Sequence, residues 1–364
     1  MATKGKIDPR ERDMNVPKEQ TVAIFRQKGG PLSVEKAPVQ KPQKGEALVH
    51  VIYSGVCHTD LHAMLGDWPL DNKLPLIGGH EGAGVVVQLG PGADEYVKVG
   101  DRVGIKWLAD SCLKCDQCRR GHEPNCSQAQ CSGFTMDGSF QQYAIASARH
   151  LTPIPDSLDL ETASPLLCAG VTVYRAVKEA RLTPGETVAI VGAGGGLGHL
   201  AVQYAVNAGY RVIAIDSGAE KEKLARSLGA EAFVDFAKEK DLVQAVKDTT
   251  ADKQGPSAAI VAASGGKAYE QALDYLRPRG TLVAVGLPPD TNIQANVFFT
   301  VFKALHIVGS YVGNRQDAIE SLDIAGRGKV KVIHKTVGLS SLPDIYDQMH
   351  AGKIAGRIVL DLDK

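Results

Sequence analysis

The distribution of apolar positions divides the chain into two regions that predict different kinds of structure. Up to about residue 155, short apolar runs are separated by glycine turns, and such runs are typical of short strands. The clearest are EALVHV (46–51), AGVVVQL (83–89) and GSFQQYAIA (138–146), while YSGVCHTDLHAML (53–65) predicts a turn that leads into a helix. Residues 109–133 have almost no periodicity, so we expect an irregular lobe there.

After residue 160 the pattern changes. The segment ETASPLLCAGVTVYRAVKEA (161–180) carries helical periodicity, and strand and helix patterns then alternate for about 140 residues. The predicted strands are ETVAIVG (186–192), YRVIAID (210–216), AEAFVDF (230–236), SAAIVAA (257–263), GTLVAVG (280–286) and ALHIVGS (304–310). The predicted helices between them include GHLAVQYAVNAG (198–209) and EKEKLARSLGA (220–230). This alternation predicts an α/β fold with a doubly wound parallel sheet.

These two patterns of apolar positions predict a division of the chain into domains. We expect a polar, frayed N-terminal arm at residues 1–20 and a mainly-β domain at 21–165, which includes the irregular lobe at about 109–130. A parallel-sheet domain follows at 166–308. Residues 309–364 are too few for a third core, and we expect them to pack back on the first domain.

Composition and charge exclude several classes of function. The chain has 364 residues, of which 44% are apolar and 23% charged, as in ordinary globular proteins. Lys plus Arg and Asp plus Glu number 41 each, so no net charge favours nucleic acid or an anionic membrane. No apolar segment approaches the length of a membrane span. Residues 1–20 resemble neither a signal peptide nor a transit peptide, which favours the cytoplasm.

Glycines gather at the end of the first predicted parallel strand. The sequence there is Gly192-Ala193-Gly194-Gly195-Gly196-Leu197-Gly198, followed by a helix. Glycines in this position permit a tight turn, the approach of a pyrophosphate to the backbone, and close packing of helix on strand. A strict G-x-G-x-x-G is not present, because Leu197 occupies its last position. The absence of G-K-[S/T] argues against a triphosphatase loop.

The end of the next strand supports a dinucleotide site. Asp216 lies about 20 residues after the glycine loop, where an acidic side chain binds the adenosine ribose hydroxyls. Ser217 and Gly218 follow, and no Arg is placed to receive a 2′-phosphate, so NAD is favoured over NADP. Lys221 is placed either to help hold the ribose or to lie on a solvated helix surface.

Two sets of cysteine and histidine residues have the character of metal ligands. Four thiols with the spacing C-x2-C-x2-C-x7-C can enclose a structural zinc, with an iron–sulfur cluster as the alternative; they are Cys112, Cys115, Cys118 and Cys126. Cys57, His80 and Cys168 are dispersed, yet two Cys and one His form the ligand set of a catalytic zinc with an open position. Taken alone, Cys168 would be an ordinary core residue.

The motifs together resemble the zinc-containing medium-chain alcohol dehydrogenases of yeast and fungi. The family signature is matched by Gly79-His80-Glu81-x-x-Gly84-x5-Gly90-x-x-Ala93, and YSGVCHTDLH, GDWPL, GIKWL, DGSFQQYA and LCAGVTVY are also similar. The resemblance runs from about Thr21 to the C-terminus. It implies a GroES-like catalytic domain, a Rossmann NAD-binding domain, NAD and two zinc ions per chain, and a homotetramer.

The resemblance also implies roles for particular residues. Cys57, His80 and Cys168 would bind the catalytic zinc, with Glu81 behind the metal and Asp60 orienting His80. Thr59 and His62 match the family's proton relay, in which the alcohol proton passes through Thr59 and the cofactor ribose to His62. The implied cofactor contacts are His58 and Arg357 at the pyrophosphate, Thr172, Val285 and Leu287 at the nicotinamide, and Gly192, Gly195, Gly196, Leu197, Gly198, Asp216 and Lys221 in the dinucleotide domain.

The same resemblance predicts the substrate. Trp68 and Trp107 match bulky residues that narrow the family's pocket, which favours ethanol and short primary alcohols, oxidised reversibly to aldehydes. Met64, Leu65 and Leu287 depart from close relatives, so the same chemistry on larger or secondary alcohols is an alternative. A zinc-free reductase or a non-catalytic dinucleotide-binding scaffold is disfavoured, because the candidate ligands and relay residues are all present. Cys131 has no ligand role in the family pattern, and we expect it to be a small buried residue.

Overall fold

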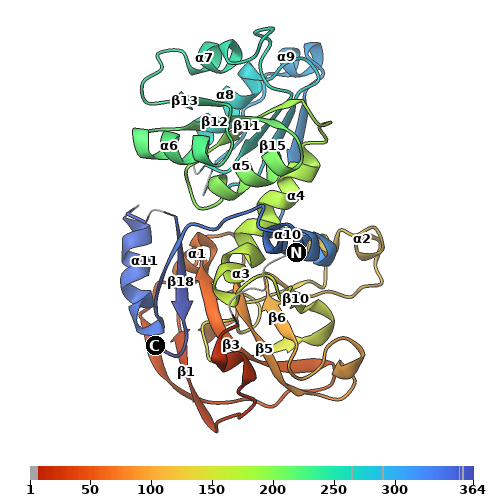
Figure 1. Ribbon diagram of the computed structural model, residues 1–364, viewed down its shortest axis with the longest axis vertical. Helices are drawn as coiled ribbons and strands as arrows, with labels where there is room; N and C mark the ends of the chain where they lie inside the picture. Colours follow the sequence, from red (N-terminus) through yellow and green to blue (C-terminus); the bar gives the residue numbers. More distant parts are fainter. Residues whose placement is uncertain (1–6, 264, 289–290, 352, 355) are drawn as a thin grey trace. The chain divides into compact units, whose positions relative to one another are not determined.

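The computed structural model describes residues 7–263, 265–288, 291–351, 353–354 and 356–364 (Figure 1). The chain separates into two compact units, and each is described by itself. Unit 1 consists of the residues up to Val171, Gly313–Gly328 and Val332–Lys364. Unit 2 consists of Thr172–Val312 and Lys329–Lys331. Within the described ranges, no helix combines the length and the apolar character that a membrane crossing requires.

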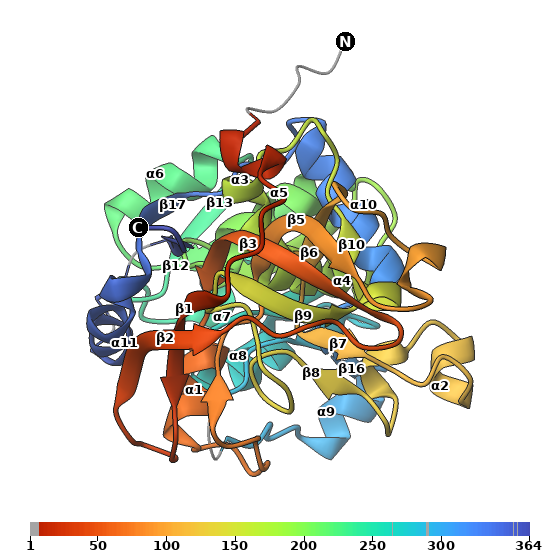
Figure 2. The same cartoon turned by 90° about the horizontal axis from the view of Figure 1, so that it is seen from below.

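Unit 1 is built from small, largely antiparallel sheets. One has the strand order β10-β6-β5-β3-β18-β17, with β9 also paired to β3, and others have the orders β2-β1-β4 and β7-β8. Figure 2 shows β9 beside β3 and β2 beside β1, as the pairing requires. The strands are β1 (Glu19–Phe25), β2 (Leu32–Pro38), β3 (Glu46–Val56), β4 (Leu76–Ile77), β5 (Gly82–Leu89), β6 (Arg102–Ile105), β7 (Leu108–Asp110), β8 (Gln130–Cys131), β9 (Tyr143–Ser147), β10 (Thr152–Pro153), β17 (His334–Gly338) and β18 (Arg357–Asp361).

The centre of unit 1 is β3, which pairs with β5, β9 and β18. Its run Ala47–Ile52 is buried throughout, and apart from His50 all its residues are apolar, so the pattern does not alternate. The helices of unit 1 are α1 (His58–Leu65), α2 (Asp116–Arg119), α3 (Leu160–Pro165), α10 (Arg315–Gly326) and α11 (Leu342–His350). Short 3₁₀ turns lie at Pro9–Arg12, Ala93–Glu95, Glu123–Asn125, Ala148–His150 and Leu339–Ser341.

Unit 2 is a doubly wound parallel sheet. Its strand order is β13-β12-β11-β14-β15-β16, and every neighbouring pair is parallel. The strands are β11 (Thr187–Val191), β12 (Arg211–Asp216), β13 (Ala232–Asp235), β14 (Ala258–Val261), β15 (Thr281–Ala284) and β16 (His306–Gly309). The order reverses between β11 and β14, which is where ligands bind in open sheets of this kind. The α/β class predicted from the sequence is confirmed.

Helices cover both faces of this sheet. They are α4 (Val171–Glu179), α5 (Gly198–Asn207), α6 (Ala219–Ser227), α7 (Leu242–Asp248), α8 (Gly266–Tyr275) and α9 (Val297–Phe302). Helices α5 and α6 contact one another, and so do α7 and α8. The two pairs lie on opposite faces (Figure 1), as right-handed crossovers between parallel strands require.

Local details differ from the sequence-based expectations in two places. Strand β9 (Tyr143–Ser147) includes only the second half of the predicted run 138–146, because the backbone of Gly138–Phe140 instead donates hydrogen bonds to the carbonyls of Ile77, Gly78 and Gly79. The long helical segment 161–180 is interrupted by a π-helical turn at Leu166–Gly170. Pro165 ends the preceding helix α3 and supplies no backbone N–H.

The N-terminal arm is anchored over its described residues, whereas we expected it to be frayed. Asp8 caps a 3₁₀ turn in a capping box with Glu11, whose carboxylate contacts Arg102 at 2.7 Å. Arg10 forms ion pairs with Asp8 at 2.7 Å and with Asp361 of β18 at 2.6 Å. Asp361 is almost fully buried. The arm therefore joins the N-terminal residues to the last strand of the chain.

Replacing Arg10 is expected to destabilise unit 1. The Arg10→Met variant leaves the buried Asp361 carboxylate without its guanidinium partner, so we expect a loss of about 2 kcal/mol near neutral pH. The hydrogen bond from Arg10 lowers the pKa of Asp8 to about 2, from 3.8. An acid whose pKa is lowered in the folded state stabilises the fold at pH values above its unfolded pKa, and this contribution is lost as the pH falls through the folded pKa. The difference in the free energy of unfolding between parent and variant should therefore narrow between about pH 4 and pH 2.

The measurement is urea unfolding of parent and variant over this pH range. Arg26→Met is the matched control, because the Arg26–Glu35 pair is exposed on both sides and such pairs contribute less than about 1 kcal/mol. Equal losses in the two variants would show that the arm is not an anchor.

Candidate active site and metal centres

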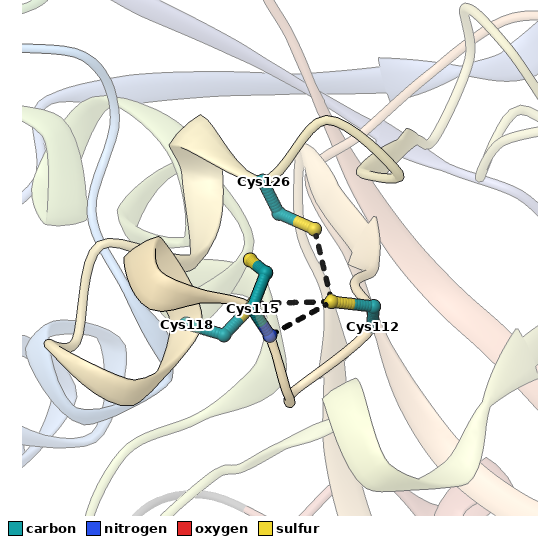
Figure 3. A group of neighbouring side chains, drawn as sticks. All are labelled: Cys112, Cys115, Cys118 and Cys126. Atoms are coloured by element: carbon teal, nitrogen blue, oxygen red, sulfur yellow. Dashed lines mark hydrogen bonds between the residues drawn. The ribbon is translucent and has the colours of Figure 1, made fainter.

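The four-cysteine cluster lies in the irregular lobe of unit 1 (Figure 3). The ligand atoms of its members lie within 4.8 Å of one another, and all are free thiols; they are Cys112, Cys115, Cys118 and Cys126. The Sγ atoms of Cys112 and Cys126 are 3.5 Å apart, and the backbone N–H of Cys115 points at Cys112 Sγ from 3.3 Å. Hydrogen bonds from the backbone N–H groups of Lys114 and Cys115 lower the pKa of Cys112 to about 6. Backbone N–H groups aimed at clustered sulfurs fit a tetrathiolate metal site.

The lobe is tied to the rest of unit 1 by buried polar contacts. The Glu123 carboxylate accepts from Arg315 Nε at 2.8 Å, and the Gly121 carbonyl accepts from the Asn314 side chain at 2.8 Å. Arg315 and Asn314 lie at the start of α10. These contacts hold the segment around Gly121 and Glu123 in place against α10, although the lobe contains little regular structure.

A second cluster is fully buried in unit 1. One ligand atom from each of Cys57, His80, Glu81 and Cys168 lies within 4.8 Å of the others. Residues far apart in the sequence therefore meet here. His80 Nε2 lies 3.2 Å from Cys168 Sγ. A hydrogen bond from the Cys168 thiol holds the pKa of Cys57 well below its ordinary value, which favours the thiolate that binds metals.

Local backbone geometry places each of these side chains. Cys57 is the N-cap of α1, directly after the central strand β3. His80 follows Gly79, whose φ of +93° is in the region that favours glycine. Cys168 lies in the π-helical turn after Pro165, and such turns inside helices are frequent at functional sites.

Asp60 fixes the orientation of His80. Its carboxylate is 1% exposed and lies 2.7 Å from His80 Nδ1. It also accepts from the backbone N–H groups of Cys57 at 2.9 Å and Gly79 at 3.2 Å. A carboxylate only accepts hydrogen bonds, so Nδ1 carries the proton and Nε2 presents its lone pair to the cluster. This arrangement fits a zinc ligand.

Glu81 contacts Arg357 rather than solvent. Its Oε1 is hydrogen-bonded to Arg357 Nη2, while the buried Oε2 has no hydrogen-bond partner among the described residues. Burial raises the pKa of Glu81 to about 7. A Cβ on Gly55 would lie 1.8 Å from Oε2, so only glycine leaves room for this carboxylate. A buried carboxylate oxygen beside two thiols and an imidazole fits a cation-binding site.

An aromatic wall adjoins the second cluster. The Trp107 ring meets the His80 ring edge-on at 5.2 Å, and Trp68 meets Trp107 at 6.3 Å. Phe134 packs against both tryptophans, at 6.1 Å from Trp68 and 5.6 Å from Trp107. The sequence analysis missed Phe134. A Cβ on Gly133, the residue before it, would lie 2.7 Å from the backbone of Gly79, a close approach that the sequence pattern did not predict.

The predicted relay residues lie on α1. Thr59 is half-buried in its first turn, and His58, the first residue of the helix, is exposed. His62 stacks on Trp68 with ring centroids 5.3 Å apart. The structure therefore brings His62 to the aromatic wall. Cys131 is half-buried in β8 rather than buried, a correction to our expectation, because β7–β8 is a two-stranded sheet.

The glycine loop lies in unit 2, between β11 and α5. Gly192 has a φ of +80°, and a Cβ on Gly198 would lie 1.9 Å from the Gly192 carbonyl. Gly195 donates to the same carbonyl at 3.0 Å. Gly196 and Leu197 complete the loop at the start of α5, where the first turn of a helix leaves N–H groups without internal acceptors. This is the place for an anion in such folds.

Asp216 ends the neighbouring strand β12. Its buried carboxylate accepts from the backbone N–H of Gly194 at 2.9 Å and of Ser217 at 2.8 Å, and it pairs with Lys221 Nζ at 2.7 Å. The Lys221 side chain is about half exposed and contacts Asp216, so it lies beside the acid that we expect to bind the ribose.

The remaining predicted cofactor residues are spread over both units. In unit 2, Thr172 is buried in α4, and within the described ranges its hydroxyl has no hydrogen-bond partner. Val285 is buried just after β15, and Leu287 is 60% exposed. Arg357 belongs to unit 1, where its buried side chain contacts Glu81.

A parallel sheet with a glycine loop at its switch point, and a separate unit holding two cysteine-rich clusters, define a metal-containing, dinucleotide-dependent dehydrogenase. Comparisons with known proteins agree. Residues 43–156 match the alcohol dehydrogenase GroES-like domain, and residues 196–352 match the zinc-binding dehydrogenase domain. The chain belongs to the zinc-containing alcohol dehydrogenase family, and it is an oxidoreductase of that family.

Individual relatives are similar over nearly the whole chain. Alcohol dehydrogenase 1 of Neurospora crassa is 56% identical over 349 residues, which cover 96% of this chain and 99% of that protein. The alcohol dehydrogenase of Schizosaccharomyces pombe is 52% identical over 353 residues, covering 96% and 100%. The crystal structure of an alcohol dehydrogenase from Aeropyrum pernix superimposes with a TM-score of 0.85 at 33% identity, covering 94% of this chain and 100% of that one.

Replacing Asp60 is expected to weaken zinc binding at the second cluster selectively. In the Asp60→Asn variant, the amide NH2 group must face one of three donors, those of Cys57, Gly79 and His80. We expect an affinity about 10- to 100-fold lower, with the four-cysteine site unaffected. The measurement is zinc content per chain after dialysis against increasing chelator. Asp71→Asn, at an exposed acid of the same segment, is the control, and simultaneous loss of both zinc ions would contradict the assignment.

Proposed function

We propose that the protein catalyses the reversible, NAD-dependent oxidation of ethanol and other short primary alcohols to aldehydes. The observation that carries this proposal is the buried cluster of two thiols and one imidazole beside the ring of Trp107. The cluster has the donors of a catalytic zinc, and the tryptophan limits the room next to it.

The metal-binding roles follow from the donor sets. Cys57, His80 and Cys168 would hold the catalytic zinc, and the four thiols of the lobe would hold the structural one. When bound, the catalytic zinc supplies Lewis-acid polarisation of the substrate oxygen, which acidifies an alcohol or activates a carbonyl. Glu81 lies within reach of the same site, with Arg357 balancing its charge.

The protein's own side chains would do the remaining work. Asp60 holds the His80 ring in one orientation, so the ligand geometry is fixed before substrate arrives. The buried aromatic rings exclude water from the reacting centre. Thr59 would accept the alcohol proton and pass it by way of the ribose to His62, whose side chain is 20% exposed and can release it to water.

NAD would bind to unit 2. The loop from Gly192 to Gly198 would hold the pyrophosphate, with His58 and Arg357 as further contacts. Asp216 would bind the ribose hydroxyls together with Lys221, and its buried carboxylate would repel the 2′-phosphate of NADP. Thr172, Val285 and Leu287 would contact the nicotinamide. In this scheme unit 1, which includes Cys168, is the catalytic domain and unit 2 is the cofactor domain.

A substrate panel tests the reaction and the pocket together. Purified protein should reduce NAD fastest with ethanol, more slowly with butanol, 2-propanol and benzyl alcohol, and hardly use NADP, and chelation should abolish the activity. Trp68→Ala should raise kcat/KM for benzyl alcohol relative to ethanol by about 10-fold or more. Tyr96→Ala, at an exposed aromatic residue, should leave kcat/KM unchanged for both benzyl alcohol and ethanol.

The possible results separate the hypotheses. If the parent protein prefers larger or secondary alcohols, the proposed alcohol oxidation stands, but the assignment of Trp68 and Trp107 to a narrow substrate pocket is wrong. No turnover of any alcohol, with two zinc ions bound per chain, would overturn the proposed function.

We also propose that the protein acts in the cytoplasm as a homotetramer. The support for an assembly of several copies is a set of apolar side chains on α9 that face solvent in the single chain. They are 53–77% exposed and comprise Val297, Phe298, Phe299, Val301 and Phe302. Strand β16 beside it ends the sheet order. Large exposed apolar patches mark interfaces, and edge strands offer unpaired backbone groups to a second copy.

A charge placed in this patch should dissociate the assembly. Phe302→Glu would leave a carboxylate in a buried interface, so the molar mass by light scattering should fall to half of the parent value or less. Val99→Glu, at an exposed apolar residue of unit 1, should keep the parent mass. An unchanged mass for Phe302→Glu would place the interface elsewhere.

A further inference from the structure

Asp67 contacts the side chain to which the proton relay leads. Both of its carboxylate oxygens lie 2.9 Å from His62 Nδ1. The exposed fractions of the two side chains are 20% for His62 and 35% for Asp67, so the pair lies at the boundary between the aromatic wall and solvent. Neither the sequence pattern nor the roles proposed above assign a function to Asp67.

The end of α1 explains why the two side chains meet. Gly66 adopts φ +68° as the C-cap, and its N–H donates to the His62 carbonyl at 2.8 Å. This left-handed residue reverses the chain, so the next two residues return to the turn of helix that carries His62. Asp67 meets Nδ1 at the edge of the ring, and Trp68 stacks on its face with an interplanar angle of 23°. The imidazole is thus held in two perpendicular directions.

We propose that Asp67 is a positioning residue for the relay, one that fixes the tautomer of His62. A carboxylate can only accept a hydrogen bond, so Nδ1 carries the hydrogen and Nε2 remains an acceptor. Nε2 is then the atom that receives the relayed proton. This inference rests on the proposed alcohol dehydrogenase function, and it assigns a new residue to that site.

The proton step balances without any further reactant. During alcohol oxidation one proton arrives at Nε2, which converts the neutral imidazole into an imidazolium. The Nδ1–H bond to Asp67 is retained and now joins opposite charges. The proton then leaves from the ring to water, which the partial exposure of both side chains permits, and the neutral tautomer is restored. No electrons move in this step, and the reverse sequence supplies a proton for aldehyde reduction.

Other charged groups near the ring do not replace Asp67. His58 lies one helical turn earlier on α1 and is exposed. Lys28 packs its side chain near Gly66, but its ammonium group pairs with Asp71 at 3.1 Å. The carboxylate of Asp67 is therefore the anionic group in direct contact with the imidazole.

The first test is a double-mutant cycle. Asp67→Ala should lower kcat for ethanol on the order of tenfold, as part of the contribution of proton transfer, while KM for NAD changes less than about twofold. Asp67→Asn keeps an acceptor oxygen and should retain more activity than Asp67→Ala. In a His62→Gln background, Asp67→Ala should have no further effect, because the residue acts through His62. Asp71→Ala, at the neighbouring exposed acid, is the matched control.

The second test requires no turnover. In the zinc-containing protein without NAD or alcohol, ¹⁵N NMR of labelled histidine should show His62 with hydrogen on Nδ1, assigned by the signal lost in His62→Gln. In Asp67→Ala the two tautomers should mix. An unchanged tautomer in Asp67→Ala, or a parent-like kcat, would overturn the proposal even though alcohol oxidation persists. A parent protein without alcohol oxidation would instead overturn the proposed function, and the NMR result would still report on the Asp67–His62 contact.

Discussion

The arrangement of the second cluster in unit 1 depends on one buried carboxylate, that of Asp60, which accepts three hydrogen bonds. It joins the first turn of α1, the glycine turn at Gly79 and the ring of His80. Two of the candidate zinc ligands, Cys57 and His80, are therefore positioned by the same group. Because a buried carboxylate without partners would be costly, the three donors and the acceptor hold one another in place, and the cluster has one arrangement before metal binds.

Much of the fold follows from local signals in the sequence. The inner strands of unit 2, β11, β12, β14 and β15, are buried along nearly their whole length, so they appear as apolar runs. Gly192 and Gly198 indicate the turn that a parallel sheet needs between β11 and α5. The four thiols of the lobe lie within 15 residues, and spacing alone therefore predicted that they meet. The second cluster was different, because the spacing of Cys57, His80 and Cys168 does not predict that they meet; their residue types suited a catalytic zinc, and the resemblance to known dehydrogenases supported that grouping.

What the sequence could not predict depends on contacts between distant segments or on a single backbone angle. Phe134 packs against Trp68 and Trp107 because a loop passes close to Gly79, and no periodicity encodes that approach. Asp67 reaches His62 because Gly66 is left-handed. The arm is anchored because Arg10 meets Asp361 from the other end of the chain. The residue types were visible in each case, but their partners were not.

The aromatic rings that lead from His62 through Trp68 and Trp107 to His80 have a consequence for spectroscopy. The chain contains two tryptophans, and both belong to this wall. The indole emission of the entire protein therefore originates in one place, between the imidazole of His62, the proposed relay residue, and that of His80, the proposed zinc ligand. Tryptophan fluorescence, excited at the red edge of the protein's absorption, therefore reports on the surroundings of Trp68 and Trp107 alone, without any label.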